Sequence, residues 1–420
     1  MTKILIKSAK ILNQGSSHHG KVRDVLIDKD KIVKIGKISE KANQEIDAKG
    51  MVLSMGWFDM RAWFADPGFE HKEDITSGRE AAMEGGFTGV ALLPNNNPVT
   101  QTKNDISYLS SGNRLSITQV YPIAAVTHDT KGEDLTEMID LHTAGAIAFS
   151  DGLKPIWHSD ILLKTLQYLQ KFDGLLIDRP EDIHLNMFGV MNEGMTSTML
   201  GMKGMPTLAE ELIVQRNLDI LTYAGGRLHM SCISSDKSLA LIRAARKKGL
   251  HITCDMASYQ TSFDDSALKD FDTAYKVNPP FRTPAEIKAL IKGLQDGTID
   301  VIVSGHIPHD EECKKLEFDH ADFGITSLQT VAANIASLSE KVEMELLIEK
   351  LTTNPRKLLK LPIHNIEEGE MADLTLFDPN HKWTLEPKTN KSKSVNTPFW
   401  KVPLKGKTVA IFNNGLYYIN

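Results

Sequence analysis

The middle of the chain alternates between short apolar runs, typical of buried strands, and longer stretches with helical periodicity. This alternation limits the possible folds most, because strands that alternate with helices build a parallel sheet covered by helices. The simplest closed form is a (β/α)8 TIM-like barrel. The strand-like runs lie at 89–94, 146–150, 175–178, 227–234, 251–256 and 300–305, and the helical stretches at 161–172, 207–223, 237–249 and 284–297.

Both ends of the chain show strand patterns without helices. Apolar residues alternate within residues 1–55, around the turn DKDK at 28–31, and again in 369–386 and 406–420. Asn-Asn-Gly at 413–415 is typical of a hairpin turn. Two strand sets that flank the helical middle predict one small composite β-sandwich. We therefore assign residues 1–55 and 365–420 to this domain, and residues 56–364 to the barrel.

Composition excludes several classes of function. The net charge of -6 gives no reason to expect nucleic acid or an anionic membrane as a partner. No apolar run reaches the roughly 18 residues that a membrane span needs, and the first residues lack the apolar core of a signal peptide. The three cysteines are odd in number and widely spaced, which favours reduced thiols. We expect a cytoplasmic protein.

Six motifs are spread over most of the chain, beginning with GWFDMRAWFADPGFEHKED at 56–74 and LLPNNNPV at 92–99. Together they resemble the dihydroorotase family. The first is the segment 56–99, where that family reads G-F-I-D-x-H-x-H-x-R-E-P-G, then H-K-E-D, then M-P-N-T-N-P. The resemblance implies the barrel with its composite end domain and a role in pyrimidine biosynthesis. In active members it implies zinc-assisted hydrolysis of a cyclic amide. The other motifs are GVMNEGM (189–195), GGRLHMS (225–231), YKVNPPFR (275–282), DGTIDVIVSGHIPH (296–309) and FGITSLQT (323–330).

The residues that carry this chemistry in the family are mostly replaced here. Hydrolysis of a cyclic amide needs a metal ion to polarise the carbonyl and activate water, and a carboxylate to move the proton. The resemblance places six such positions, and only one keeps a remnant of its expected residue. Arg61 and Trp63 stand where the family has its first two histidines, Arg179 and Cys232 where it has two more, Gly305 where it has the catalytic aspartate, and Asp151 is the remnant of a ligating aspartate.

These replacements predict that the chain holds no metal and has no dihydroorotase activity. A guanidinium cannot be deprotonated in a protein, accepts no hydrogen bond and repels a divalent cation. Cys232 and Asp151 alone cannot supply the three protein ligands of a catalytic zinc ion. Gly305 offers no proton acceptor. We therefore expect no cofactor and no catalytic residue, although active family members use zinc.

The two arginines leave two interpretations open. Arg61 and Arg179 either form internal salt bridges or present a site for a small anion, because a buried charge must be paired. The candidate partners for the salt bridges are Asp59, Asp151, Asp255 and Glu181. Trp63 and Cys232 have a simpler explanation, since a large ring and a small thiol can fill space in a packed interior.

Three further residues match family positions that contact substrate. They are Asn95 in PNNNP, Asn278 in KVNPP and His309 in GHIPH, whereas the arginine that holds the substrate carboxylate in the family is replaced by Ala65. These loops also have structural reasons to exist, such as a turn fixed by proline. Residual ligand capture and structural support of the barrel rim both remain open.

Three hypotheses about function follow. The leading one is a catalytically inactive dihydroorotase homologue that builds oligomers or regulates a partner, since the family contains inactive members that assemble with aspartate carbamoyltransferase. We expect a homo-oligomer, with aspartate carbamoyltransferase as a possible partner. The second is an amidohydrolase with a rebuilt site, and the third is a small-anion sensor that uses Arg61 and Arg179.

Overall fold

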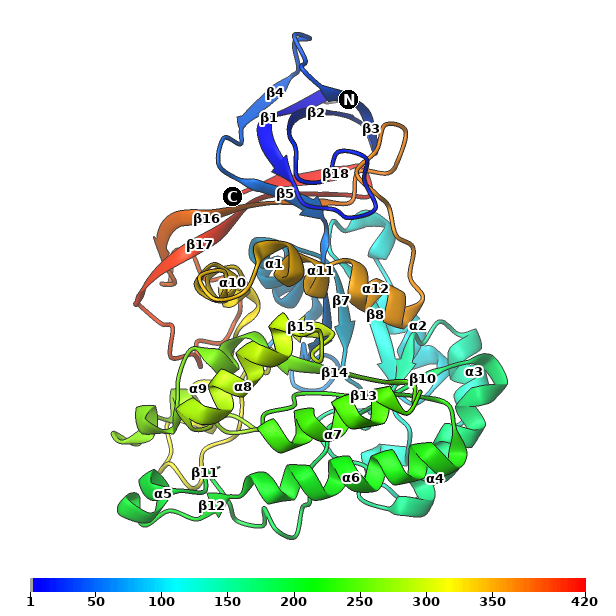
Figure 1. The fold of residues 1–420 in the computed structure, drawn as a ribbon, viewed down its shortest axis with the longest axis vertical. Coiled ribbons are helices and arrows are strands. Elements are labelled where there is room, and N and C mark those ends of the chain that lie inside the picture. Colours follow the sequence, from blue (N-terminus) through cyan, green and yellow to red (C-terminus); the bar gives the residue numbers. More distant parts are fainter. Residues whose placement is uncertain (1–2) are drawn as a thin grey trace.

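The computed structural model describes residues 3–420 and divides them between two eight-stranded sheets (Figure 1). In one sheet all strands are parallel, in the order β15-β14-β13-β10-β9-β8-β7-β6. Its two edges meet where Ala62 pairs with His306, and the Trp63 amide donates to the His306 carbonyl at 2.9 Å. The sheet therefore closes, and the predicted (β/α)8 barrel is confirmed.

The barrel strands are short and buried on both sides. β7 (Phe87–Leu92) is buried at every position, because alternate residues face the barrel interior and the surrounding helices. β8 was not among the predicted runs, and β9 has only two residues. The other strands are β6 (Trp57–Ala62), β8 (Gln119–Ala124), β9 (Ala148–Phe149), β10 (Leu175–Asp178), β13 (Arg227–Met230), β14 (Ile252–Ala257) and β15 (Val301–Val303).

The helices begin at residues suited to helix starts. α1 (Ile75–Gly85) follows Asp74, whose carboxylate accepts the Ser77 amide at 2.8 Å, and α8 (Pro284–Gln295) begins with a proline. The remaining helices are α2 (Lys103–Ser110), α3 (Met138–Thr143), α4 (Ser159–Leu169), α5 (Met195–Leu200), α6 (Thr207–Ala224), α7 (Asp236–Lys247), α9 (Glu311–Lys314), α10 (Val331–Leu338), α11 (Met344–Leu351) and α12 (Thr353–Leu359). None of the helices within 3–420 is long and apolar enough to cross a membrane.

The second sheet joins both ends of the chain. Its order is β18-β17-β16-β5-β1-β2-β3, with β4 paired to β1, and it encloses its own apolar cluster. The hydrogen bonds make one continuous sheet, which curls over at the top of Figure 1. Its strands are β1 (Lys3–Ile11), β2 (Val22–Asp28), β3 (Lys31–Gly36), β4 (Gln44–Asp47), β5 (Val52–Met55), β16 (Leu374–Thr384), β17 (Pro403–Asn413) and β18 (Leu416–Ile419).

The chain passes from this sheet into the barrel at Gly56, between β5 and β6. A Cβ at this position would lie 2.0 Å from Asp373 Oδ1 and 2.0 Å from Thr88 Oγ1, so the crossing requires glycine. The two-stranded pair of β11 (Met191–Asn192) and β12 (Gly204–Met205) lies outside both sheets.

The connection 385–402 between β16 and β17 runs from the end sheet to the barrel rim. Its Asn396 amide donates to the Ile307 carbonyl at 3.1 Å, and its Ser394 hydroxyl donates to the Lys72 carbonyl at 2.7 Å. The connection therefore lies against the segments that follow β6 and β15, where a barrel enzyme keeps its site.

Candidate functional site

Arg61 lies near the end of β6 and is only 2% exposed. Its guanidinium donates to the Ser231 hydroxyl at 3.4 Å and to the Gly152 carbonyl at 3.5 Å. Among residues 3–420 it forms no ion pair with a carboxylate. The Ser231 hydroxyl in turn donates to the Asp255 carboxylate at 2.9 Å. Arg61 is therefore linked to this carboxylate only indirectly, through the Ser231 hydroxyl.

Arg179, directly after β10, is paired with Glu181. Its guanidinium also donates to the Leu153 carbonyl at 2.7 Å. Burial tends to raise the pKa of Glu181, but the charge of Arg179 and hydrogen bonds from Asn186 and Arg179 outweigh it, and the pKa is lowered. The charge of Arg179 is therefore compensated within the chain, which leaves Arg61 as the better candidate for an anion site.

Trp63 fills the space at the end of β6. The indole nitrogen donates to Asn96 Oδ1 at 2.9 Å, and the ring centroid lies 5.8 Å from that of Phe69 and 6.2 Å from that of His309. Because the ring is buried and its polar atom is bonded, its surroundings are those of a packed interior residue.

Gly305 has a φ of +64°, in the left-handed region. A Cβ at this position would lie 3.1 Å from both Cε1 and the hydroxyl oxygen of Tyr259, which is 2% exposed. The Tyr259 ring therefore crowds the space into which an aspartate side chain at this position would extend.

Cys232 is buried beside these residues. Its amide donates to Asp255 Oδ1 at 2.6 Å, and burial raises the pKa of its thiol to about 11. At neutral pH the sulfur is therefore a protonated thiol, which is a poor nucleophile and must lose its proton before it can bind a metal ion. Asp255 also pairs with the buried His229 at 2.9 Å.

Asp151 holds a loop together. Its Oδ1 accepts the amides of Val126 and Thr127, both at 3.0 Å, and its Oδ2 accepts the Thr127 hydroxyl at 2.6 Å. Burial raises the pKa of Asp151 to about 6 despite these bonds. Asn95 continues the same network, since it donates to the Asp151 carbonyl at 3.0 Å and accepts the Leu153 amide at 2.7 Å.

The donor set at these strand ends does not fit zinc. A catalytic zinc ion takes three nitrogen, oxygen or thiolate ligands and keeps one open position. The positions given by the resemblance offer two guanidinium groups, an indole, a protonated thiol and a carboxylate whose two oxygens are already bonded. We derive no step of catalysis through a metal ion at this place.

The other two predicted contact residues lie on either side of this region. Asn278 donates to the Glu181 carboxylate at 3.2 Å, so it supports the Arg179 pair. His309 lies at the rim, where burial and the neighbouring charge of Lys72 lower its pKa to about 4 and keep it neutral. Its amide donates to Asn396 Oδ1 at 3.0 Å, which joins the rim to the 385–402 connection.

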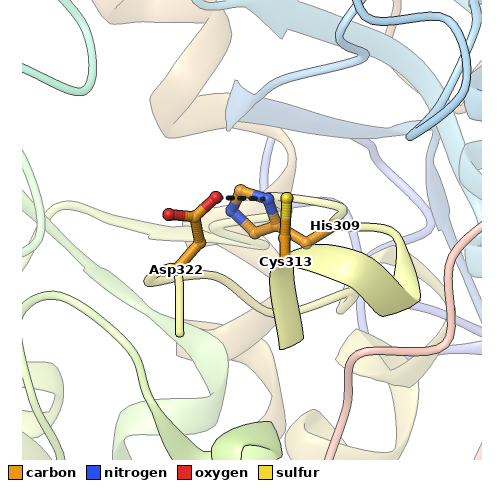
Figure 2. Close-up of side chains that lie close together, drawn as sticks. All are labelled: His309, Cys313 and Asp322. Carbon is orange, nitrogen blue, oxygen red and sulfur yellow. Dashed lines mark ion pairs between the residues drawn. The ribbon is translucent and has the colours of Figure 1, made fainter. Parts of the chain in front are cut away.

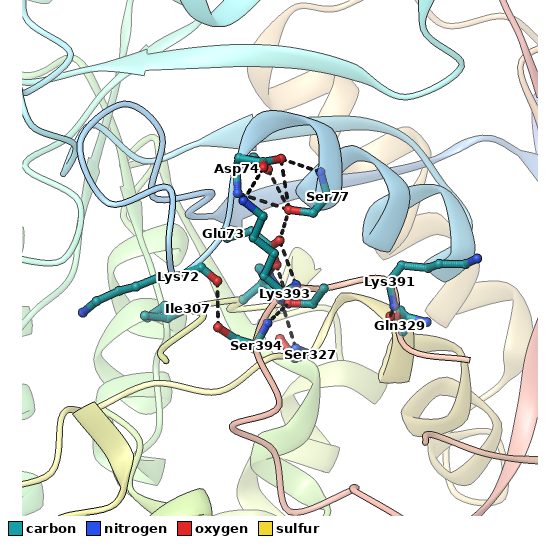
Figure 3. Close-up of polar contacts among 12 residues, drawn as sticks. Lys72, Glu73, Asp74, Ser77, Ile307, Ser327, Gln329, Lys391, Lys393 and Ser394 are labelled. Atoms are coloured by element: carbon teal, nitrogen blue, oxygen red, sulfur yellow. Dashed lines mark hydrogen bonds and ion pairs between the residues drawn. The ribbon is translucent and has the colours of Figure 1, made fainter. Parts of the chain in front are cut away.

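Glu73, from the HKED motif, is fully buried and holds the same connection (Figure 3). Its carboxylate accepts hydrogen bonds from the Ser392 hydroxyl, the Lys393 amide at 3.2 Å and the Ser77 hydroxyl. It also lies 3.5 Å from His306 Nε2. Glu73 therefore links α1, the barrel rim and the 385–402 connection through its carboxylate.

Sequence reasoning missed a group of possible metal ligands at the rim. His309, Cys313 and Asp322 lie close together in Figure 2, and their ligand atoms are within 4.8 Å of one another. Residues 3–420 contain no other such group of three. The available signal was a histidine and a cysteine four positions apart around a short helix. Tyr259 was also missed, because only the fold brings it against Gly305.

Comparison with solved structures defines the class of fold. L-Hydantoinase (dihydropyrimidinase) from Arthrobacter aurescens superimposes with a TM-score of 0.86 at 19% identity, covering 100% of this chain and 96% of that one. Dihydropyrimidinase from Brevibacillus agri gives a TM-score of 0.83 at 19% identity, covering 100% and 95%. The architecture is therefore the amidohydrolase-type barrel with an added sheet domain.

Sequence comparison gives the family. The model of the family "Dihydro-orotase-like" matches residues 50–238. A dihydroorotase of Syntrophus aciditrophicus is 37% identical over 419 residues, and one of Syntrophotalea carbinolica is 38% identical over 417 residues, each covering 98% of both chains. The chain belongs to the dihydroorotase-like family of pyrimidine biosynthesis, as its motifs indicated.

Proposed function

We propose that this chain is a catalytically inactive member of the dihydroorotase-like family and acts as a structural or regulatory subunit. One observation carries the proposal. The strand ends hold the buried guanidinium groups of Arg61 and Arg179 and a glycine crowded by Tyr259, in place of metal ligands and a proton acceptor. The family chemistry needs both of those groups.

The surface offers a place for a partner. Large apolar side chains are exposed along 183–212. Figure 1 shows the elements of this segment, which are β11, β12, α5 and the start of α6. The parts of this segment before and after α5 lie side by side, since the Val190 amide donates to the Lys203 carbonyl at 3.0 Å. The exposed residues are Ile183, Leu185, Met187, Phe188, Met195, Met199, Leu208 and Leu212, with Phe188 83%, Met195 76% and Met199 77% exposed.

We propose aspartate carbamoyltransferase as the partner that covers this surface. Eight exposed apolar residues amount to several hundred Å², on the order of the roughly 800 Å² per partner of a standard interface. Exposed apolar surface of this size is typical of a binding site. The choice of partner rests on the resemblance to family members that assemble with this enzyme. A second copy of the chain is the competing occupant.

The partner experiment uses purified components. The chain is mixed with aspartate carbamoyltransferase from the same organism, and the mass of the complex is measured by light scattering after gel filtration. Phe188→Ser combined with Met195→Ser is expected to abolish the complex. Leu115→Ser is the matched control, because Leu115 is 86% exposed but lies outside the segment. A complex that survives the double substitution would exclude this surface.

The activity experiment tests the first half of the proposal. Dihydroorotate hydrolysis is measured with the purified chain after addition of zinc and after addition of chelator. We expect no turnover in either case. Turnover that requires zinc and is lost with chelator would establish the rebuilt amidohydrolase instead.

Arg61 supports a second candidate function, the binding of a small anion. A buried cation without an adjacent carboxylate favours an anionic ligand. Carbamoyl aspartate, orotate and phosphate are the probes. A rise in the thermal unfolding midpoint that Arg61→Met abolishes would support this function.

A further inference from the structure

A second site, unrelated to the family's strand-end positions, lies at the barrel rim (Figure 2). His309 follows β15, Cys313 lies in α9, and Asp322 lies in the loop after α9. His309 Nδ1 is 3.6 Å from Asp322 Oδ2, and the ligand atoms of all three residues lie within 4.8 Å of one another. Imidazole, thiolate and carboxylate are the donors that zinc takes.

The imidazole is already fixed in the form that a metal needs. Its Nε2 lies 3.1 Å from the Phe323 carbonyl, which can only accept, so Nε2 carries the proton. The lone pair is therefore on Nδ1, which faces Asp322. A histidine that ligates a metal commonly donates its other N–H to a backbone carbonyl in this way.

The loop that carries the other two ligands is held in place by the backbone. The Asp322 amide donates to the Cys313 carbonyl at 3.0 Å, and Lys314 Nζ donates to the Asp322 carbonyl at 2.8 Å. Donors around a tetrahedral zinc ion lie roughly 3.3–3.8 Å apart, as follows from metal–ligand distances near 2.0–2.3 Å. Asp322 is half exposed, with 53% of its side chain accessible, and can rotate to close the difference.

A cation already lies against two members of this group. Lys72 Nζ lies 3.0 Å from His309 Nδ1 and 3.7 Å from Asp322 Oδ2. It also lies 6.0 Å from the ring centroid of Trp63 and 5.9 Å from that of Phe69. The three side chains therefore create a potential that favours positive charge. An ammonium held by a long flexible stem can be displaced by a tighter-binding ion.

We propose that His309, Cys313 and Asp322 form a binding site for a thiophilic divalent ion such as zinc, and that Lys72 is the cation that gives way when the ion binds. The charges balance. Before binding, the Lys72 ammonium offsets the Asp322 carboxylate beside a neutral thiol. On binding, Cys313 loses its proton to solvent, Lys72 swings into solvent, and the ion offsets a thiolate and a carboxylate. The ion ties α9 and its loop to the end of β15.

Cobalt spectroscopy tests the ligands. Apo protein is titrated with Co²⁺ and then with Zn²⁺ as competitor, and thiolate-to-cobalt absorption reports the Cys313 bond. We expect one ion per chain, loss of this absorption in Cys313→Ser, and weaker binding by about tenfold or more in Asp322→Asn. Asp319→Asn is the matched control, because Asp319 is exposed in the same loop. Absence of thiolate absorption, or equal binding by Cys313→Ser, would overturn the site.

The lysine provides the most discriminating variant. Lys72→Met removes the competing charge, so zinc should bind about tenfold more tightly than to the unaltered chain. Weaker binding would contradict the proposed exchange. Release of one thiol proton also requires the affinity to fall about tenfold for each pH unit below the thiol pKa. Circular dichroism and thermal unfolding confirm that each variant is folded.

Thiol labelling gives an independent readout. Cys232 and Cys254 are buried, whereas Cys313 is partly exposed and should be the first cysteine that iodoacetamide modifies. At a zinc concentration just sufficient to protect Cys313 in the unaltered chain, protection should be largely lost in Asp322→Asn, which binds the ion more weakly. Equal labelling with and without zinc would overturn the proposal. These measurements are independent of dihydroorotate turnover and of partner binding, so the proposed function can fail while this site stands.

Discussion

The two buried arginines predict opposite responses to the same substitution. Arg179 and its partner Glu181 have 8% and 11% of their side chains exposed. Removing one member of a buried ion pair typically costs about 3–5 kcal/mol, because the other charge stays buried and unpaired. Because Glu181 keeps some contact with water, the lower end of this range applies. Arg179→Met should therefore lower the free energy of unfolding by about 3 kcal/mol.

Arg61→Met should not show this loss. The Arg61 guanidinium makes two long hydrogen bonds to neutral oxygens, and the carboxylate of Asp255 lies beyond Ser231 and already pairs with His229. Removing a buried cation that has no adjacent carboxylate leaves no opposite charge unpaired, and it relieves the cost of keeping that cation away from water. We expect a change within about 1 kcal/mol of zero, or a gain in stability.

Urea unfolding followed by tryptophan fluorescence measures both variants, since Trp57 and Trp63 lie in the barrel wall and its mouth. The refuting result is a loss in Arg61→Met equal to or larger than the loss in Arg179→Met. It would mean that Arg61 interacts with a counter-charge strongly enough to stabilise the fold. The measurement is repeated with orotate and with phosphate, because an anion bound at Arg61 would stabilise the unaltered chain and leave Arg61→Met unchanged.

Three further predictions test other parts of the structure. Gly305→Ala should lower the free energy of unfolding in urea by about 2 kcal/mol, because it adds both backbone strain at a positive φ and a close contact with Tyr259. Gly297→Ala, where φ is +76° and the surrounding space is open, should cost only about 1 kcal/mol. Equal losses would show that Tyr259 moves aside. Burial raises the pKa of Asp59 from 3.8 to about 7, so the folded state binds this proton more tightly than the unfolded state does. The free energy of unfolding, compared with that of Asp59→Asn, should therefore fall as pH rises from 4 to 7. A difference between the two chains that does not change with pH would contradict this. Glu73→Ala should speed tryptic cleavage of the 385–402 connection about tenfold, because it removes the hydrogen bonds to Ser392 and Lys393. Glu80→Ala, on the exposed side of α1, should leave the cleavage rate unchanged. An unchanged rate in Glu73→Ala would show that other contacts hold the connection.

The barrel was predictable because its signal is local and repeated. Apolar runs such as 175–178 and helical stretches such as 284–297 are visible in single windows of the sequence, and their order implies a parallel sheet. β8 was missed because QVYPIA contains a proline and mixes polar with apolar residues. The closure through Ala62 and His306 joins positions more than 240 residues apart and carries no local signal.

The site was predictable where the interacting residues lie close in the sequence. Glu181, two positions after Arg179, was among the possible partners, and the structure pairs them. Asp59, Asp151 and Asp255 were also candidates for Arg61, but none is within ion-pair distance of it in the part of the chain that is described. The crowding of Gly305 by Tyr259 depends on how the chain turns after β14, and the rim group depends on a loop that returns Asp322 to Cys313. Neither follows from residue spacing.

The motifs that identify the family are explained here by contacts within the chain. Glu73 of HKED clamps the 385–402 connection, Asn95 of PNNNP holds the Asp151 loop, and Asn278 of KVNPP supports Glu181. Each side chain has at least one polar atom bonded to a protein partner, which supports a structural role and leaves ligand capture untested. These contacts therefore give each of the three motif residues a role in holding the barrel rim. Under the proposed function, the side chains at the strand ends, where Arg61, Arg179 and Gly305 stand, are the ones that would distinguish this chain from an active member of the family.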